Sequence, residues 1–140
     1  MASFAKYAVV AIVVAGVAIG VWRVFAPSSD AGIVKVSVPT LSSLAMAGEV
    51  AFEATCAACH GKNGGGTENG PPLIHDIYNP GHHSDEAFYL AAKLGTRQHH
   101  WSFGNMPPQE GVTDEDLAAI VAYVRELQQA NGILYRPHRM

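Results

Sequence analysis

Two cysteines and a histidine with a fixed spacing are the residues of this sequence best suited to chemistry. They lie in Cys56-Ala57-Ala58-Cys59-His60, which contains both cysteines of the 140-residue chain. The pattern C-x-x-C-H is typical of c-type haem attachment. At a helix end, two thiols three positions apart can form thioethers with the two vinyl groups along one porphyrin edge. The histidine that follows then lies under the iron. We therefore expect one covalent haem c on Cys56 and Cys59, with His60 as the proximal iron ligand.

A redox-active Cys-x-x-Cys of the thioredoxin kind is the main alternative for these cysteines. Such a motif needs a preceding strand and a βαβ setting, whereas the residues before Cys56 have a helical pattern. Two random cysteines fall three apart about once in seventy placements. Because 7 of the 140 residues are histidine, chance gives the whole motif roughly once in 1,400 such sequences. Haem attachment is therefore the favoured interpretation.

The iron needs a sixth ligand or an open site, and we expect a methionine. Of the four methionines, Met1 and Met140 are terminal and Met46 lies in the predicted helix before the haem motif. Met106 lies among Gly, Asn and Pro just before the last predicted helix, where the chain can cross the opposite haem face. A methionine there has no apolar stripe to complete, so Met106 is predicted to bind the iron. A second histidine is the alternative, and five loop histidines could supply it: His75, His82, His83, His99 and His100.

Three predicted helices and a long loop must position these residues. Apolar periodicity predicts a helix from residue 43 to the haem motif, and capping signals at Ser84 and Thr113 predict helices over about 84–94 and 113–130. Residues 60–83 are rich in Gly and Pro, and so long a loop in a small domain indicates that it wraps a bound group. No strand pattern competes. We predict an all-α domain over residues 43–140, whose small core the haem completes.

The first 26 residues are predicted to form an N-terminal membrane anchor, a single transmembrane helix. Fourteen of the sixteen residues 7–22 are apolar and the other two are glycines, between Lys6 and Arg23. As a helix these sixteen residues span about 24 Å, a little less than the roughly 30 Å hydrocarbon core of a bilayer. We expect flanking residues to close the difference.

A cleaved signal peptide is the alternative for this segment, with cleavage after Ala26 or Ala31. Either reading predicts that the rest of the chain is exported. Residues 27–42 show no sustained period and are predicted to be a linker.

Composition excludes several other classes of protein. The net charge of -3 at pH 7 argues against a nucleic-acid binder, which needs a basic face to neutralise phosphates. Two cysteines are too few for a disulfide framework. The run Gly64-Gly65-Gly66 lacks the Gly-Lys-Ser/Thr ending of a phosphate loop.

The pairs His82-His83 and His99-His100 could suggest a copper or zinc site. Adjacent histidines seldom point both rings at one metal, and histidines in polar loops are usually solvated. We therefore do not expect a second metal there.

Two residues before Met106 could contact the haem edge. Trp101 and Arg97 could donate hydrogen bonds to the haem propionates, whose charges need partners when partly buried. Plain packing is the alternative for Trp101.

From about residue 45 to 130 the sequence resembles class I cytochromes c. When the N-terminus is included, it resembles the membrane-anchored bacterial members of that family, which carry one haem. The spacing Gly48-x-x-x-Phe52-x-x-x-Cys56 is similar to that of the family's first helix. There the glycine lets the last helix cross closely. Ile120 and Tyr123 match the aliphatic and aromatic positions of that last helix.

Three loop residues extend the resemblance. Pro71 matches the proline whose carbonyl accepts a hydrogen bond from the proximal histidine, and Leu73 matches the leucine packed on the haem. Met106 falls in the family's axial Met-Pro motif. The resemblance therefore implies the cytochrome c fold and His60/Met106 ligation.

The resemblance also implies a monohaem electron carrier rather than an enzyme, with both axial ligands retained and no small-molecule substrate. Its partners would be redox proteins or membrane respiratory or photosynthetic complexes. Residues 45–140 hold six Lys and Arg against eleven Asp and Glu, so such partners should present positive charge. The expected location is the bacterial cytoplasmic membrane, with the haem domain on the periplasmic side.

Three alternative functions remain for the haem domain. It could be a haem-c subunit of a larger oxidase or dehydrogenase complex. Without ligation by Met106, a five-coordinate haem could bind a gas or reduce peroxide. The weakest alternative is a metal-handling protein that uses the histidine pairs.

Overall fold

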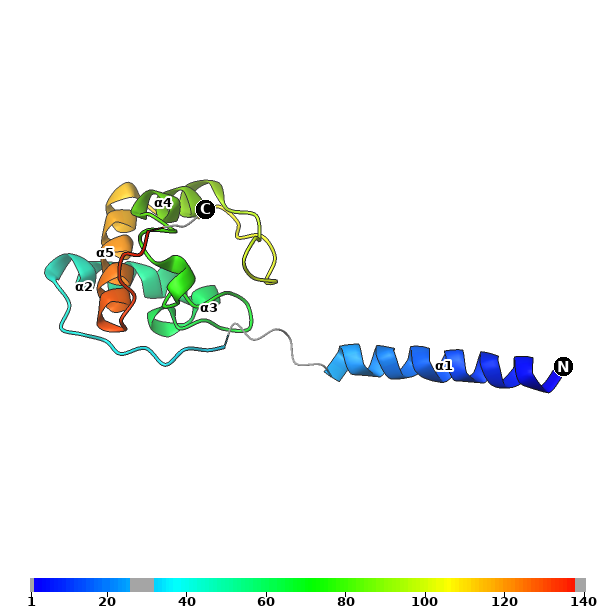
Figure 1. The fold of residues 1–140 in the computed structure, drawn as a ribbon. Helices are drawn as coiled ribbons and strands as arrows, with labels where there is room; N and C mark the ends of the chain where they lie inside the picture. Colours follow the sequence, from blue (N-terminus) through cyan, green and yellow to red (C-terminus); the bar gives the residue numbers. More distant parts are fainter. Residues whose placement is uncertain (1, 26–31, 138–140) are drawn as a thin grey trace. The chain divides into compact units, whose positions relative to one another are not determined.

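The structure is a computed structural model that describes residues 2–25 and 32–137 (Figure 1). The chain divides into two compact units, Met1–Asp30 and Ala31–Met140. The first unit holds one helix, α1 (Ala2–Phe25). In the second unit, residues 32–137 form four α-helices and two 3₁₀ turns: α2 (Ser43–Thr55), α3 (Ala57–His60), η1 (Lys62–Gly64), η2 (Asp76–Tyr78), α4 (Asp85–Leu94) and α5 (Asp114–Ala130).

Helices make up the regular structure of both units. The part of the chain that is described contains no strand, only an isolated antiparallel bridge between Thr96 and Met106. The prediction of an all-α domain is therefore confirmed.

Helix α1 covers the segment predicted to be a membrane anchor. Among the described residues, no helix is long and apolar enough to cross a membrane, so the predicted transmembrane helix is not supported. The two cleavage points considered above, Ala26 and Ala31, lie outside the described residues.

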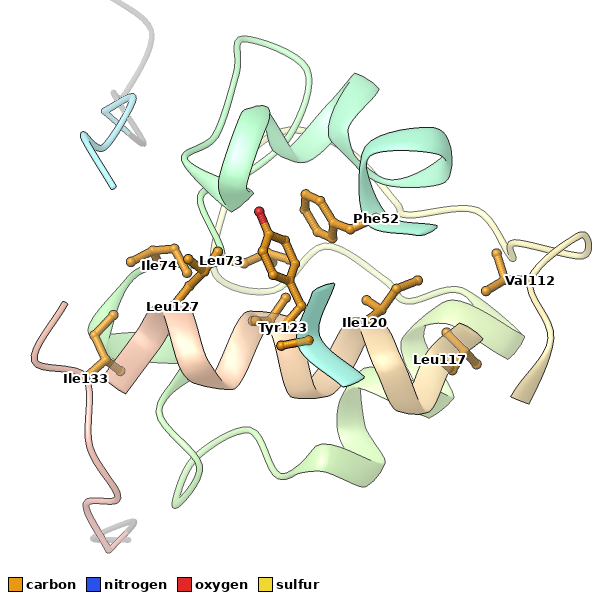
Figure 2. Close-up of a cluster of buried hydrophobic side chains, with 11 residues drawn as sticks. Phe52, Leu73, Ile74, Val112, Leu117, Ile120, Tyr123, Leu127 and Ile133 are labelled. Atoms are coloured by element: carbon orange, nitrogen blue, oxygen red, sulfur yellow. The ribbon is translucent and has the colours of Figure 1, made fainter. Parts of the chain in front are cut away.

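The close crossing of α2 and α5 organises the second unit (Figure 1). A Cβ added to Gly48 of α2 would lie 1.9 Å from the carbonyl oxygen of Ala119 in α5. Only a glycine fits this approach. One helical turn further on, the rings of Phe52 and Tyr123 pack with centroids 5.6 Å apart (Figure 2).

Local capping sets the start of both crossing helices. The side chain of Ser42 accepts a hydrogen bond from the Ala45 amide at the start of α2. Thr113 and Asp116 form a reciprocal capping box at the start of α5. Each cap satisfies backbone amides that have no partner within the helix.

The hydrophobic core lies where α5 meets α2 and the loop after α3 (Figure 2). Its aromatic members, Phe52 and Tyr123, have no exposed surface. The other members are aliphatic and come from the helices and loops: Ala45, Leu73, Ile74, Val112, Leu117, Ile120, Val124, Leu127 and Ile133.

Buried polar side chains tie the loops to α5. Gln128, 1% exposed, donates hydrogen bonds to the carbonyl oxygens of Leu73 (3.0 Å) and Tyr78 (3.1 Å). The Tyr123 hydroxyl donates to Asn63 Oδ1 at 2.9 Å. Burial, reinforced by two nearby glutamates, raises the pKa of Tyr123 to about 12.

Residues 32–42 have no regular structure but are attached to the domain. The Val34 amide donates to the Gly65 carbonyl at 2.7 Å, and the Ser37 amide donates to Asn131 Oδ1 at 2.9 Å. Val36 packs against the core. Part of the segment predicted to be a linker is therefore bonded to the helical domain.

Candidate functional site

A largely apolar cavity of about 400 Å³ opens beside the core of the second unit. This volume lies within the range of cofactor and ligand pockets. Its walls come from α2, α4, α5 and the loops on either side of α4. Apolar side chains dominate them, among them Phe52, Leu73, Phe88, Leu117, Ile120 and Val121.

His60 lines this cavity at the end of α3. Its Nδ1 lies 2.9 Å from the Pro71 carbonyl oxygen, and because a carbonyl can only accept, Nδ1 carries the proton. Burial lowers the pKa of His60, and the Pro71 bond opposes that shift. The neutral imidazole therefore keeps a lone pair on Nε2, the form that binds a metal.

Cys56 is the N-cap of α3 and Cys59 lies within this helix, and both are free thiols. Cys56 is half-buried and lines the cavity, whereas Cys59 is exposed and lies outside the cavity lining. Burial raises the pKa of the Cys56 thiol, and the Thr55 hydroxyl, 3.4 Å from Cys56 Sγ, lowers it in part. The sulfur of Cys56 is thus held at the cavity in its neutral form.

Met106 also lines the cavity and is half-buried. The loop that carries it is fixed by two backbone hydrogen bonds to Thr96, one of 3.0 Å and one of 2.9 Å. Gly95 ends α4 with φ of 73°, and a Cβ there would lie 2.6 Å from the Met106 carbonyl oxygen. The end of α4 therefore determines where the methionine loop runs.

Trp101 and Arg97, predicted to contact haem propionates, both line the cavity. The Trp101 indole N–H donates to the Tyr78 hydroxyl at 3.0 Å. Burial raises the pKa of Tyr78, which keeps that hydroxyl protonated. Sequence reasoning missed Tyr78. The only signal for it was its position in the long loop that was predicted to wrap a bound group.

The loop histidines are not simply solvated. His82, His83, His99 and His100 gather in one group, and three of them, His83, His99 and His100, line the cavity. His75 lies apart from that group and packs edge-on against Trp101, with ring centroids 5.0 Å apart.

The residues present fit a covalent haem. The cavity is apolar, and one wall carries a thiol and an imidazole with an available Nε2, from Cys56 and His60. Met106, from a separate loop, supplies a thioether to the same cavity. Imidazole and thioether sulfur are the donors that hold iron in one class of haem protein.

Known proteins resemble this chain in sequence and in fold. Residues 45–128 match the family model described as Cytochrome c. The chain is also similar to the crystal structure of cytochrome CL from the marine methylotrophic bacterium Methylophaga aminisulfidivorans, with 31% sequence identity and a TM-score of 0.50. That similarity covers 61% of this chain and 54% of the other, so this chain spans about half the length of that protein. No match was found among curated proteins.

Proposed function

The chain belongs to the cytochrome c family and carries one covalently attached haem c. From this premise we propose that it is a one-haem electron carrier, with the haem attached through Cys56 and Cys59 and held by His60 and Met106. The observation that carries this proposal is that His60 and Met106, from separate elements, line the same apolar cavity. A haem with both axial positions filled by protein transfers electrons but offers no site for oxygen or peroxide.

Each residue has a distinct part in this proposal. When bound, the haem supplies a one-electron couple between ferric and ferrous iron. The Pro71 carbonyl holds the proton at His60 Nδ1, which orients the ring and increases the basicity of Nε2. The thioether of Met106 favours the ferrous state and gives a higher reduction potential than a second histidine would.

The cavity walls would keep water from most of the haem. Phe52, Ile120 and Val121 present apolar surface from the two crossing helices. The Tyr78 hydroxyl accepts a hydrogen bond from the Trp101 indole N–H. It stays protonated, so its own O–H can donate to an acceptor in the cavity. A propionate oxygen is the acceptor that we propose there, since its charge needs a donor when partly buried.

Charge supports a partner with a positive docking surface. Residues 45–140 hold six Lys and Arg against eleven Asp and Glu, a net charge of -5. Association with such a partner should weaken as salt screens the attraction. Two exposed leucines at the cavity, Leu90 and Leu94, would contribute apolar contact.

We also propose that the haem domain works outside the cytoplasm. The support is a basic residue, Lys6, followed by an apolar segment, as in export signals. Fractionation of bacterial cells that make the full chain tests this point. Haem absorbance should follow the periplasmic or the outward-facing membrane fraction, and a haem domain protected from external protease in spheroplasts would contradict it.

The carrier proposal is tested by potentiometric titration of the purified haem-loaded protein, followed by exposure of the reduced protein to carbon monoxide. We expect one reversible one-electron wave and no carbon monoxide adduct. Met106→Ala serves as the positive control, because removal of the thioether opens a position that carbon monoxide can fill. A reduced wild-type protein that binds carbon monoxide as readily as this variant would favour the five-coordinate alternative.

A further inference from the structure

Four histidines from two loops gather beside the cavity, and three of them, His83, His99 and His100, line it. His82 and His83 lie in the turn before α4, whereas His99 and His100 lie in the loop after it. The ring centroids of His82 and His100 are 5.2 Å apart, and His83 and His100 have the same spacing. His82 and His83 are neighbours in the sequence, and His100 approaches both of them from the other loop.

Three of these imidazoles can reach one ion. A nitrogen from each of His82, His83 and His100 lies within 4.8 Å of the other two. The Nε2 atoms of His82 and His100 are 3.3 Å apart. Two nitrogens bound at about 2.0–2.1 Å to one tetrahedral ion are separated by about 3.3–3.4 Å. This pair therefore already has the spacing that a shared ion needs.

His83 is oriented in the way that metal-binding histidines usually are. Its Nδ1 donates to the Ile77 carbonyl oxygen at 2.7 Å, so Nε2 keeps a lone pair. A bond from the other ring nitrogen to a backbone carbonyl fixes the tautomer and increases the basicity of the ligand. His83 thus offers one ligand nitrogen within 4.8 Å of those of His82 and His100.

We infer that His82, His83 and His100 form a second metal site, for a divalent late transition-metal ion such as Zn²⁺ or Cu²⁺. The ligand chemistry sets this class, because imidazole suits zinc, copper and nickel whereas calcium and magnesium prefer oxygen ligands. His99 packs on His100 with ring centroids 4.2 Å apart. It thereby helps to hold the third ligand.

The charges around the cluster are compatible with a bound cation. Burial lowers the pKa of His83 and of His100, although the Ile77 hydrogen bond opposes this shift at His83. The lowered pKa favours the neutral imidazole that metal ligation requires. Arg125 donates to the His83 carbonyl oxygen at 2.5 Å and is a fixed cation beside the cluster. Asp85 accepts from Arg125 Nε at 2.7 Å and offsets its charge.

The site would be coupled to the haem because His83 and His100 also line the haem cavity. A divalent cation there favours the ferrous state of the iron, which carries less positive charge. Metal binding therefore raises the haem reduction potential, and by reciprocity the reduced protein binds the metal more tightly.

The test is equilibrium dialysis of the untagged, haem-loaded full chain against zinc chloride, with zinc and haem both quantified. Zinc is the first probe because it exchanges no electrons with the haem. We expect one zinc per haem, and affinity at least roughly tenfold weaker in His82→Gln and in the double variant H82Q/H100Q. Zinc should also raise the haem potential of the wild type but not that of the double variant. His75→Gln, which changes a histidine outside the cluster, should bind zinc like the wild type.

Two results would overturn the site. The first is a wild-type protein that takes up no zinc at micromolar free concentration, or whose uptake survives H82Q/H100Q. The second is a direct effect of the histidines on the haem. In that case the wild type binds no zinc, yet the haem reduction potential of metal-free H82Q/H100Q differs from that of the metal-free wild type. Haem content and the visible spectrum, measured on the same samples, separate either result from a failure of haem attachment.

Discussion

Gly48 offers the most quantitative test of how the fold builds the haem cavity. A Cβ at this position would lie 1.9 Å from the Ala119 carbonyl oxygen, 2.4 Å from its carbon and 2.9 Å from Tyr123 Cβ. The first two of these atoms are backbone atoms of α5 and cannot rotate away. Replacement of Gly48 by alanine must therefore push α2 and α5 apart.

The size of the effect follows from these distances. A carbon–oxygen contact requires about 3.3 Å, so the helices must separate by roughly 1.4 Å where they cross. Overpacking of this kind costs about 3 kcal/mol, the upper part of the usual range. The better helix propensity of alanine returns about 1 kcal/mol. The net loss of about 2 kcal/mol should lower the melting temperature by roughly 8–16 °C in a domain of this size.

Thermal unfolding of the haem-loaded protein, followed by far-ultraviolet circular dichroism, measures this loss. Gly111→Ala is the matched control, because no heavy atom lies within 4 Å of a Cβ at Gly111 and its φ is not in the left-handed region. It should melt within a few degrees of the wild type. A Gly48→Ala protein as stable as this control would refute the close crossing of α2 and α5.

Three further substitutions test other parts of the domain. Gln128→Leu should cost about 1–3 kcal/mol in urea unfolding, because it removes the donor to the buried Leu73 carbonyl and the Gln128 oxygen that accepts from Arg125 Nη1. The exposed neighbour Gln129→Leu should change stability by less than about 0.5 kcal/mol; equal effects would contradict this. The double variant C56S/C59S should show no cooperative unfolding by circular dichroism, because without the haem the apolar walls of the 400 Å³ cavity face water and the small core loses the group that completes it. A folded, helical apo-protein would count against it. The pKa of Tyr123 is raised to about 12, so its protonated form stabilises the fold at neutral pH, and that contribution is lost as the pH rises from about 10 through 12. Tyr123→Phe should therefore flatten the fall in the free energy of unfolding over this pH range. An unchanged slope would disprove the assignment.

Local signals in the sequence were enough to predict most of the helices. The Thr113 and Asp116 pattern marks the start of α5, and the structure contains that capping box. Ser84 lies at the N-cap of α4 as predicted, although its side chain makes no capping hydrogen bond. These signals act over three or four residues, so they can be read without knowledge of the tertiary fold.

The contacts that the sequence did not reveal join distant loops. The Trp101 bond to Tyr78 and the approach of His82 to His100 depend on the paths of the loops on either side of α4. No periodicity or capping pattern specifies those paths.

The most direct test of the central proposal is the far-red absorption of the ferric protein at neutral pH. Methionine ligation gives ferric haem c a weak band in this region. We expect the band in the wild type and in the control Met46→Ala, which changes an exposed methionine of α2. In Met106→Ala we expect the band to be lost and the reduction potential to be lower. A wild-type spectrum without the band, or a Met106→Ala protein that keeps it, would contradict His60/Met106 ligation and with it the electron-carrier account.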